Sequence, residues 1–187
     1  AVASNTYTTD VAHPELNGLE DMPFFSQFPL DRQAELRKSP EALAAALAQS
    51  DAVLLPLARD KVLVRAAGAG SEHSLVPVML SPASSHMTAH ISGTTTFMGV
   101  DSVGSPYFAA QVQDPASLAQ PGAEAENLPH WMSARLAGQQ LSPAHAALLA
   151  VASGLSLWHQ ASAFHPVSGS PTELSQGGFA RRCTTTN

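Results

Sequence analysis

Apolar stretches separated by short polar turns fill most of the first two thirds of the chain and predict a β-sheet. Residues 52–57 and 61–66 are apolar on either side of a short turn, which is the pattern of a β-hairpin. The segments 75–80, 95–100 and 107–112 predict further strands of similar length. Pro77 lies inside the first of these three, which favours an edge strand or a bulge there.

Two short helices are expected before the hairpin. Asp31 can cap the first, which would run through Leu36. Ser39 followed by Pro40 is typical of the start of a second helix, because a hydroxyl caps the free amides and proline fits the first turn.

Helical periodicity returns in the last third of the chain. A short helix is expected around Trp131, and a longer one starts at Ser142 and is stopped by Pro166. Apolar positions of the longer helix recur at helical steps, at Leu148, Val151, Ala152, Leu155 and Trp158. The pattern therefore predicts an α+β fold, with a mostly antiparallel sheet, packed helices, and a long helix leading into a glycine-rich tail.

The pattern also suggests three regions. Residues 1–22 show little periodicity and are expected to form an extended arm, residues 23–141 the α+β domain, and residues 142–187 the long helix with the tail. Phe24, Phe25 and Phe28 follow the arm and are expected to anchor it on the fold.

Composition narrows the classes of function. The chain has 187 residues, of which 44% are hydrophobic, and this suits one domain with a sizeable core. A net charge of −6 with only nine Lys and Arg residues argues against binding of nucleic acid through its phosphates. No apolar run reaches the ~20 residues that a membrane helix needs, so the sequence predicts a protein that is soluble or attached peripherally to a membrane.

The single cysteine, Cys183, excludes a disulfide within the chain and favours a reducing compartment. The sequence starts without Met in a small, polar stretch, which suits the mature end of a protein imported into a chloroplast or mitochondrion.

Residues for catalysis are scarce. Hydrolysis of a diphosphate by metal-activated water needs a cluster of carboxylates, and only Glu173 is acidic after Glu126. There is no Gly-x-Ser-x-Gly turn for a serine nucleophile, and the glycines of 68–70 are not followed by the Lys-Ser/Thr pair of a phosphate loop. The sequence therefore indicates no catalytic residue.

The second half of the chain carries motifs in a recognisable order. Residues 157–159 read Leu-Trp-His, residues 164–172 read Phe-His-Pro-Val-Ser-Gly-Ser-Pro-Thr, and residues 177–183 read Gly-Gly-Phe-Ala-Arg-Arg-Cys. Upstream, residues 97–101 read Phe-Met-Gly-Val-Asp and residues 106–109 read Pro-Tyr-Phe-Ala. Together these segments resemble the amino-terminal domain, helix and zinc ribbon of the NADH pyrophosphatases of the Nudix family.

Four positions of that resemblance correspond to the zinc ligands of the family. His165 stands at the first, Ser168 at the second, Cys183 at the third and Thr186 at the fourth. Because Ser and Thr are poor structural zinc ligands, the resemblance implies a degenerate ribbon that is expected to lack zinc. The family's acidic Nudix box has no match in these residues, so Mg²⁺ and NADH are expected only if a Nudix domain follows.

Two functions fit the resemblance. The first is a non-catalytic structural or interaction subunit, derived from an NADH pyrophosphatase-like Nudix protein and held in a larger assembly with a protein partner. The second is the amino-terminal portion of an active NAD(H) diphosphatase whose Nudix domain lies outside this chain. A free-standing nucleotide-binding domain is a third class, but no motif in the sequence favours it.

Overall fold

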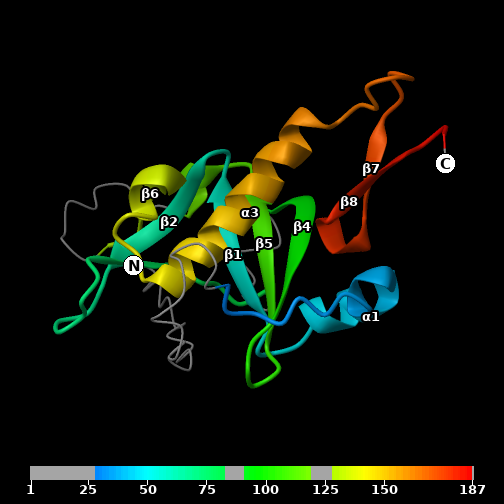
Figure 1. Ribbon diagram of the computed structural model, residues 1–187. Coiled ribbons are helices and arrows are strands. Elements are labelled where there is room, and N and C mark those ends of the chain that lie inside the picture. Colours follow the sequence, from blue (N-terminus) through cyan, green and yellow to red (C-terminus); the bar gives the residue numbers. More distant parts are fainter. Residues whose placement is uncertain (1–27, 83–90, 119–127, 187) are drawn as a thin grey trace, which may run out of the picture.

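The computed structural model describes residues 28–82, 91–118 and 128–186, and side-chain positions are not described for residues 91–94 and Ser117. Residues 1–27, including Phe24 and Phe25 of the expected arm, lie outside this range. A mixed sheet forms the centre, helix α3 crosses one of its faces, and a small hairpin lies beside strand β4 (Figure 1). The α+β architecture expected from the sequence is confirmed.

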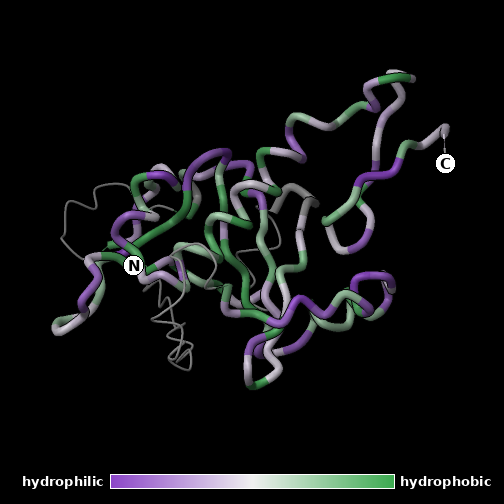
Figure 2. The backbone as a smooth tube through the Cα atoms, viewed as in Figure 1, coloured by the Kyte–Doolittle hydropathy of each residue, from purple (hydrophilic) through white to green (hydrophobic). Residues whose placement is uncertain are grey.

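The sheet has the strand order β3-β2-β1-β5-β4, and β6 also pairs with β2. All neighbouring strands are antiparallel except β1 and β5, which are parallel. The strands are β1 (Val53–Ala58), β2 (Lys61–Ala66), β3 (Leu75–Pro77), β4 (Ile91–Val100), β5 (Pro106–Val112) and β6 (His130–Ser133). Hydrophobic colours are concentrated on the strands of this sheet in Figure 2.

Strand β1 is the centre of the core because it is buried on both faces. Val53, Leu55 and Leu57 point into one apolar cluster, and Leu54 points into the other. This parity follows from the two-residue period of a strand. The continuous apolar run of 52–57 is therefore the signature of a strand covered on two sides.

Proline interrupts the pairing of β1 with β2. Pro56 has no amide hydrogen to donate, and the two strands pair only beyond it, at Leu57 and Ala58. On the other side of Pro56, the backbone of Leu54 exchanges two hydrogen bonds with Leu80, with N–O distances of 2.7 and 2.9 Å. The segment after β3 thus completes the sheet where β2 diverges.

Helices cover the two faces of the sheet separately. Helix α3 (Pro143–Ala161) contributes Leu148, Leu149 and Ala152 to the cluster on one face. Helix α1 (Pro40–Leu47) packs Leu43, Ala46 and Leu47 against the cluster on the other face, where Phe97 and Phe108 stack with ring centroids 5.3 Å apart.

The start of α1 is the one expected, with the Ser39 hydroxyl accepting from the amide of Ala42 at 3.1 Å. The expected helix from Asp31 to Leu36 is wrong. Asp31 forms a β-bridge with Val100, and its carboxylate accepts from the amide of Gln33 at 3.0 Å. Only a short 3-10 helix, η2 (Leu36–Lys38), follows.

The short helix expected around Trp131, Ala134 and Arg135 is confirmed only for the last two of these residues. Trp131 lies in strand β6, opposite Leu63 of β2, and α2 (Ala134–Ala137) begins after it. The indole nitrogen of Trp131 donates to the carbonyl of Pro115 at 2.7 Å, in the 3-10 helix η3 (Pro115–Ser117). The pairing of this segment with β2 outweighs the weak helical periodicity of its sequence.

Close packing of the bridge at Asp31 requires glycine at position 99. Gly99 has φ of +145°, and a Cβ there would overlap the carbonyl of Asp31. The register of β4 against β5 also shifts at this point, between Phe97 and Gly99.

The tail beyond α3 folds back as a hairpin of β7 (Thr172–Ser175) and β8 (Ala180–Cys183), joined by the 3-10 helix η4 (Gln176–Gly178). Helix α3 ends at Ala161 with Ser162 as its C-cap, slightly before the expected stop at Pro166. Among the described residues, no helix combines the length and apolarity needed to cross a membrane.

Candidate functional site

The four ribbon positions singled out in the sequence come together at the far end of the hairpin. His165 and Ser168 lie in the turn before β7, and Cys183 and Thr186 lie where the chain leaves β8. The Ser168 hydroxyl joins the two turns, 3.0 Å from His165 Nδ1 and 3.5 Å from Cys183 Sγ.

Backbone amides point at the first ligand position of each turn. The amide of Ser168 donates to His165 Nδ1 at 3.2 Å, and the amide of Thr186 donates to Cys183 Sγ at 3.4 Å. The two turns are therefore built alike, with each amide three residues beyond the side chain that accepts from it. Thr185, which the sequence did not single out, contributes a hydroxyl 3.4 Å from Cys183 Sγ.

The hydroxyls and amides around Cys183 change the pKa of its thiol. Hydrogen bonds from Thr185, Thr186 and Ser168 lower the pKa of Cys183 to about 5. A pKa in this range predicts a thiol that is largely ionised at neutral pH, and burial opposes the effect of the hydrogen bonds. The anion is held by neutral donors rather than by a cation.

The donor set of these turns does not suit a tetrahedral zinc ion. Zinc in structural sites takes four ligands from cysteine, histidine and carboxylate side chains, and only His165 and Cys183 qualify among the four positions. Within the described ranges, no group of three or more such side chains could hold a metal. Hydroxyls and amides close the space between the turns instead.

A second polar cluster, buried beneath the hairpin, joins the tail to the sheet. His159 of α3 has 6% of its surface exposed, and its two ring nitrogens face different elements. Nδ1 lies 3.3 Å from Arg181 Nη1 of β8, and Nε2 lies 3.4 Å from Thr96 Oγ1 of β4. Because a guanidinium can only donate, Nδ1 must accept, and the neutral ring carries its proton on Nε2.

Arg181 continues the network into β7. Its Nε donates to Thr172 Oγ1 at 2.7 Å, and its Nη2 donates to the Thr172 carbonyl at 2.9 Å. The Thr172 hydroxyl donates in turn to the carbonyl of Ser162, at the end of α3, at 2.7 Å. One chain of hydrogen bonds thus links the central sheet, the long helix and both strands of the hairpin.

The two glycines before β8 allow this close approach. Gly178 has φ of +89°, and a Cβ there would lie 2.7 Å from Thr96 Oγ1. Gly177 has φ of +61°, and its Cβ would come within 3.2 Å of Phe97. A side chain at either position would be strained and would push the hairpin off the sheet.

Phe179, next in the chain, fixes the hairpin from below. The guanidinium of Arg37 lies 3.6 Å from the centroid of its ring, within the range of a cation–π contact. Arg37 is itself buried, which lowers its pKa through desolvation, and its Nη2 donates to the carbonyl of Met98 at 3.5 Å. The segment 177–179 therefore fills a site made by η2 and β4.

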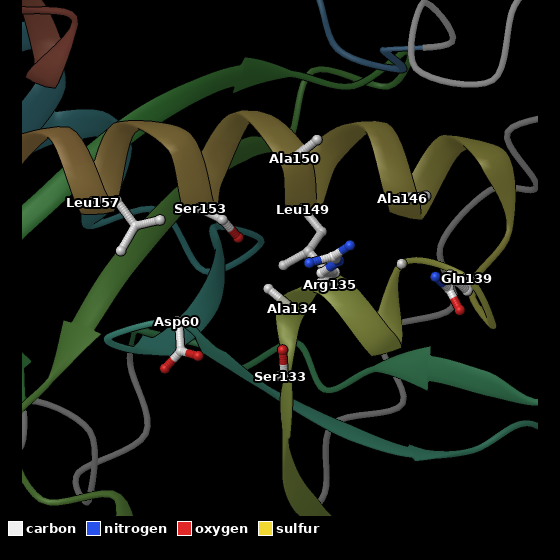
Figure 3. Close-up of a pocket in the computed structure, with 11 residues that line it drawn as sticks. Asp60, Ser133, Ala134, Arg135, Gln139, Ala146, Leu149, Ala150, Ser153 and Leu157 are labelled. Atoms are coloured by element: carbon white, nitrogen blue, oxygen red, sulfur yellow. The ribbon is translucent and has the colours of Figure 1, made fainter.

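A hollow of the surface lies away from the hairpin. A groove of about 800 Å³ runs along α3 on the flank that faces α2, and its lining is mostly apolar. Leu149, Ser153 and Leu157 approach it from α3, Arg135 from α2, and Asp60 from the β1–β2 turn (Figure 3). Neither the turns around Cys183 nor His159 contributes to it.

The sequence revealed part of this arrangement. The motif residues His159, Thr172, Gly178 and Arg181 were noted for their order, but nothing in the sequence indicated that they contact one another. Thr96 and Arg37 gave no signal, because a threonine in a strand and an arginine in a polar segment are usually exposed.

A family model described as the NADH pyrophosphatase-like rudimentary NUDIX domain matches residues 51–158. The match begins just before β1 and ends within α3, so it covers the sheet and most of the helix that packs on it. A search of curated proteins found no match to the chain.

Proposed function

Because this chain belongs to the family of NADH pyrophosphatase-like rudimentary NUDIX domains, we propose that it serves as a non-catalytic structural or interaction subunit of a larger assembly. The observation that carries the proposal is the contrast between two sets of residues in the tail. Residues that dock the hairpin on the sheet are present and bonded, while two of the four ribbon positions, Ser168 and Thr186, have lost metal-binding chemistry.

Such a tail resembles a zinc ribbon in which hydrogen bonds replace the metal. Zinc supplies much of the folding free energy of small ribbons, so a ribbon without it needs another source of stability. His159 links Arg181 of the hairpin to Thr96 of the sheet, and Phe179 supplies burial and a cation–π contact with Arg37. The hairpin is in this way an extension of the domain and not an independent module.

Exposed apolar side chains favour a protein partner. Phe164 and Val167 lie in the turn before β7 with 65% and 89% of their surfaces exposed. Single exposed apolar residues are common, but two so close together in the same segment suit the apolar core of a small protein interface. The chemistry of the partner is expected to be mainly apolar at this tip.

The proposal predicts that this chain alone does not hydrolyse NADH. Purified chain incubated with NADH and excess Mg²⁺ is expected to release no NMNH or AMP above the rate without protein. Multiple turnovers that scale with protein concentration would overturn the proposal.

Membership in this family also supports the alternative, that the residues form the amino-terminal portion of an active NAD(H) diphosphatase. The mass of the polypeptide in its native source separates the two. An enzyme would have to continue into a Nudix domain with its acidic box, so a native polypeptide larger than the 19.5 kDa of this chain by such a domain would favour the alternative.

A further inference from the structure

The long helix α3 exposes a surface without charge. Residues 136–172 contain no Asp, Glu, Lys or Arg, and this stretch includes the whole of α3. A helix at the surface of a domain normally carries charged residues on the side that meets water. Because the central part of a protein interface is depleted of charged residues, the outer face of α3 is suited to burial against another protein.

The exposed residues of this face form a stripe along the helix. Ala150, Gly154, Leu157 and Ala161 follow one another at steps of four, three and four residues, and all four are exposed. Leu157 protrudes most among them as a large side chain, with 48% of its surface exposed. Rows of side chains at this spacing are the ones that pack between the rows of a second helix.

The groove of about 800 Å³ runs beside this stripe, and Ala150 and Leu157 belong to both. A protruding row and an apolar hollow therefore lie side by side on one face of the molecule. A dimer with a two-fold axis needs a surface that is complementary to itself, since the same residues face each other from both sides. A row next to a hollow meets this need, because rotation by half a turn brings each row over the hollow of the other copy.

One acid and one base stand at the groove. Figure 3 shows Asp60 toward the Leu157 end of α3 and Arg135 beside Leu149. Both residues are exposed, and neither forms an ion pair among the described residues. The amide of Ala134 donates to the backbone carbonyl of Asp60 at 2.8 Å, which fixes the β1–β2 turn against the start of α2. The two charges are thereby held near each other at the edge of the apolar surface.

This pair of charges favours a second copy over an acidic or a basic peptide. A ligand with one sign of charge is attracted by one of the two residues and repelled by the other. A second copy, related by a two-fold axis that passes between Asp60 and Arg135, brings its own Arg135 to Asp60 and its own Asp60 to Arg135. Both charges are then paired, and only uncharged residues of α3 are buried.

We propose that two copies of this chain form a dimer through the outer faces of α3, with the two helices antiparallel. Leu157 of each copy enters the groove of the other, and Arg135 of each copy pairs with Asp60 of the other. The dimer uses residues outside the hairpin, so it does not depend on the structural role proposed for the tail.

Sedimentation equilibrium of the full chain tests whether the dimer forms. The mass is expected to approach twice 19.5 kDa as the concentration rises. Leu157→Glu places an acid in each groove and is expected to raise the dissociation constant at least ~10-fold. Val103→Glu, at an exposed apolar residue of the β4–β5 loop, is the control and is expected to leave the constant unchanged. A chain that stays monomeric up to ~1 mM, or equal effects of the two variants, would overturn the proposal.

Charge reversal tests the pairing between copies. Asp60→Arg and Arg135→Glu each create two repulsive contacts in a dimer of identical chains, and each is expected to weaken that dimer at least ~10-fold. An equimolar mixture of the two variants restores both pairs, so native mass spectrometry is expected to find the mixed dimer in excess over the dimer of either variant. Glu72→Arg, exposed in the β2–β3 loop, is the matched reversal and is expected to dimerise like the unaltered chain.

The mixture separates contacts between copies from effects within one chain. A variant that is only misfolded gains nothing from the other variant, while a trans pair is rebuilt by it. Absence of the mixed dimer, or a dimer of either variant as tight as that of the unaltered chain, would overturn the proposal.

Discussion

Arg181 Nη1 meets the Nδ1 atom of His159 at 3.3 Å, so a cation and a titratable ring face each other beneath the hairpin. The contact is favourable only while His159 is neutral. It joins the last strand of the tail to the long helix, and the other nitrogens of Arg181 bind Thr172 of β7. The pair is thus one of the contacts that hold the tail on the domain, together with Phe179 on Arg37.

Removal of the guanidinium is expected to detach the hairpin. Arg181→Ala loses two hydrogen bonds to Thr172 and the contact with His159, and we expect a loss of about 2–3 kcal/mol, since hydrogen bonds from charged groups contribute ~1.5–3 kcal/mol. Urea unfolding measures the change. Lys38→Ala, which removes only an exposed ion pair with Glu35, is the control and is expected to cost less than ~1 kcal/mol. Equal effects of the two variants would argue against the docking role.

The glycine beneath the hairpin offers a second test. Gly178→Ala places a Cβ against Thr96 in a left-handed conformation, and overpacking with backbone strain is expected to cost about 2–4 kcal/mol. Gly154→Ala is the matched variant, because Gly154 is helical and no described atom lies within 4 Å of its added Cβ. That change is expected to stabilise the protein by ~0.5–1 kcal/mol. Thermal unfolding of both variants checks the contrast.

The stability of the tail is expected to depend on pH through His159. Burial first, and Arg181 second, lower the pKa of His159 below 6.5, while a hydrogen bond with the backbone of Gly178 opposes them. The unfolded chain therefore binds the proton more readily than the folded one. Stability is full above about pH 6.5 and falls as the pH drops through the lowered pKa of the folded state.

Proton NMR of the His159 ring gives this pKa directly, and unfolding at several pH values gives the linked loss of stability. His159→Gln is expected to flatten the profile below pH 6.5. A ring that titrates at or above 6.5 would contradict the arrangement.

The thiol at the end of the hairpin is expected to react as an anion at neutral pH. Cys183 is the only cysteine, so alkylation by iodoacetamide reports on it alone. The rate is expected to rise with an inflection near pH 5, the pKa set by its hydroxyl and amide donors. Thr185→Val removes the first of these donors and is expected to move the inflection upward. An inflection near 8.5 in the unaltered chain, the ordinary thiol value, would contradict the ring of donors.

Local patterns in the sequence predicted most of the sheet and the two main helices. The hairpin of 52–57 and 61–66, the start of α1 at Ser39 and the start of α3 at Ser142 all follow from residue period and capping. Strand β6 was missed because Trp131 pairs with Leu63, almost seventy residues away, and short segments carry little local signal. The parallel pairing of β1 with β5 likewise depends on contacts between distant segments and has no local sequence signal.

The candidate site was likewise predictable from the sequence only in part. The four ribbon positions could be recognised only through the resemblance of the surrounding motifs to a known family, and the residues at two of them, Ser168 and Thr186, predicted the change in chemistry. The docking network could not be recognised, since His159, Thr96 and Arg181 come from three elements that only the folded chain brings together. Buried polar contacts of this kind depend on tertiary geometry rather than on sequence pattern.

Amide hydrogen exchange of β7 and β8, measured with and without a strong zinc chelator, tests most directly the claim that hydrogen bonds and not metal hold the tail. The amides of Thr172–Ser175 and Ala180–Cys183 are expected to keep the same protection under both conditions and to gain none from added zinc. Loss of protection with the chelator, restored by stoichiometric zinc, would contradict the account.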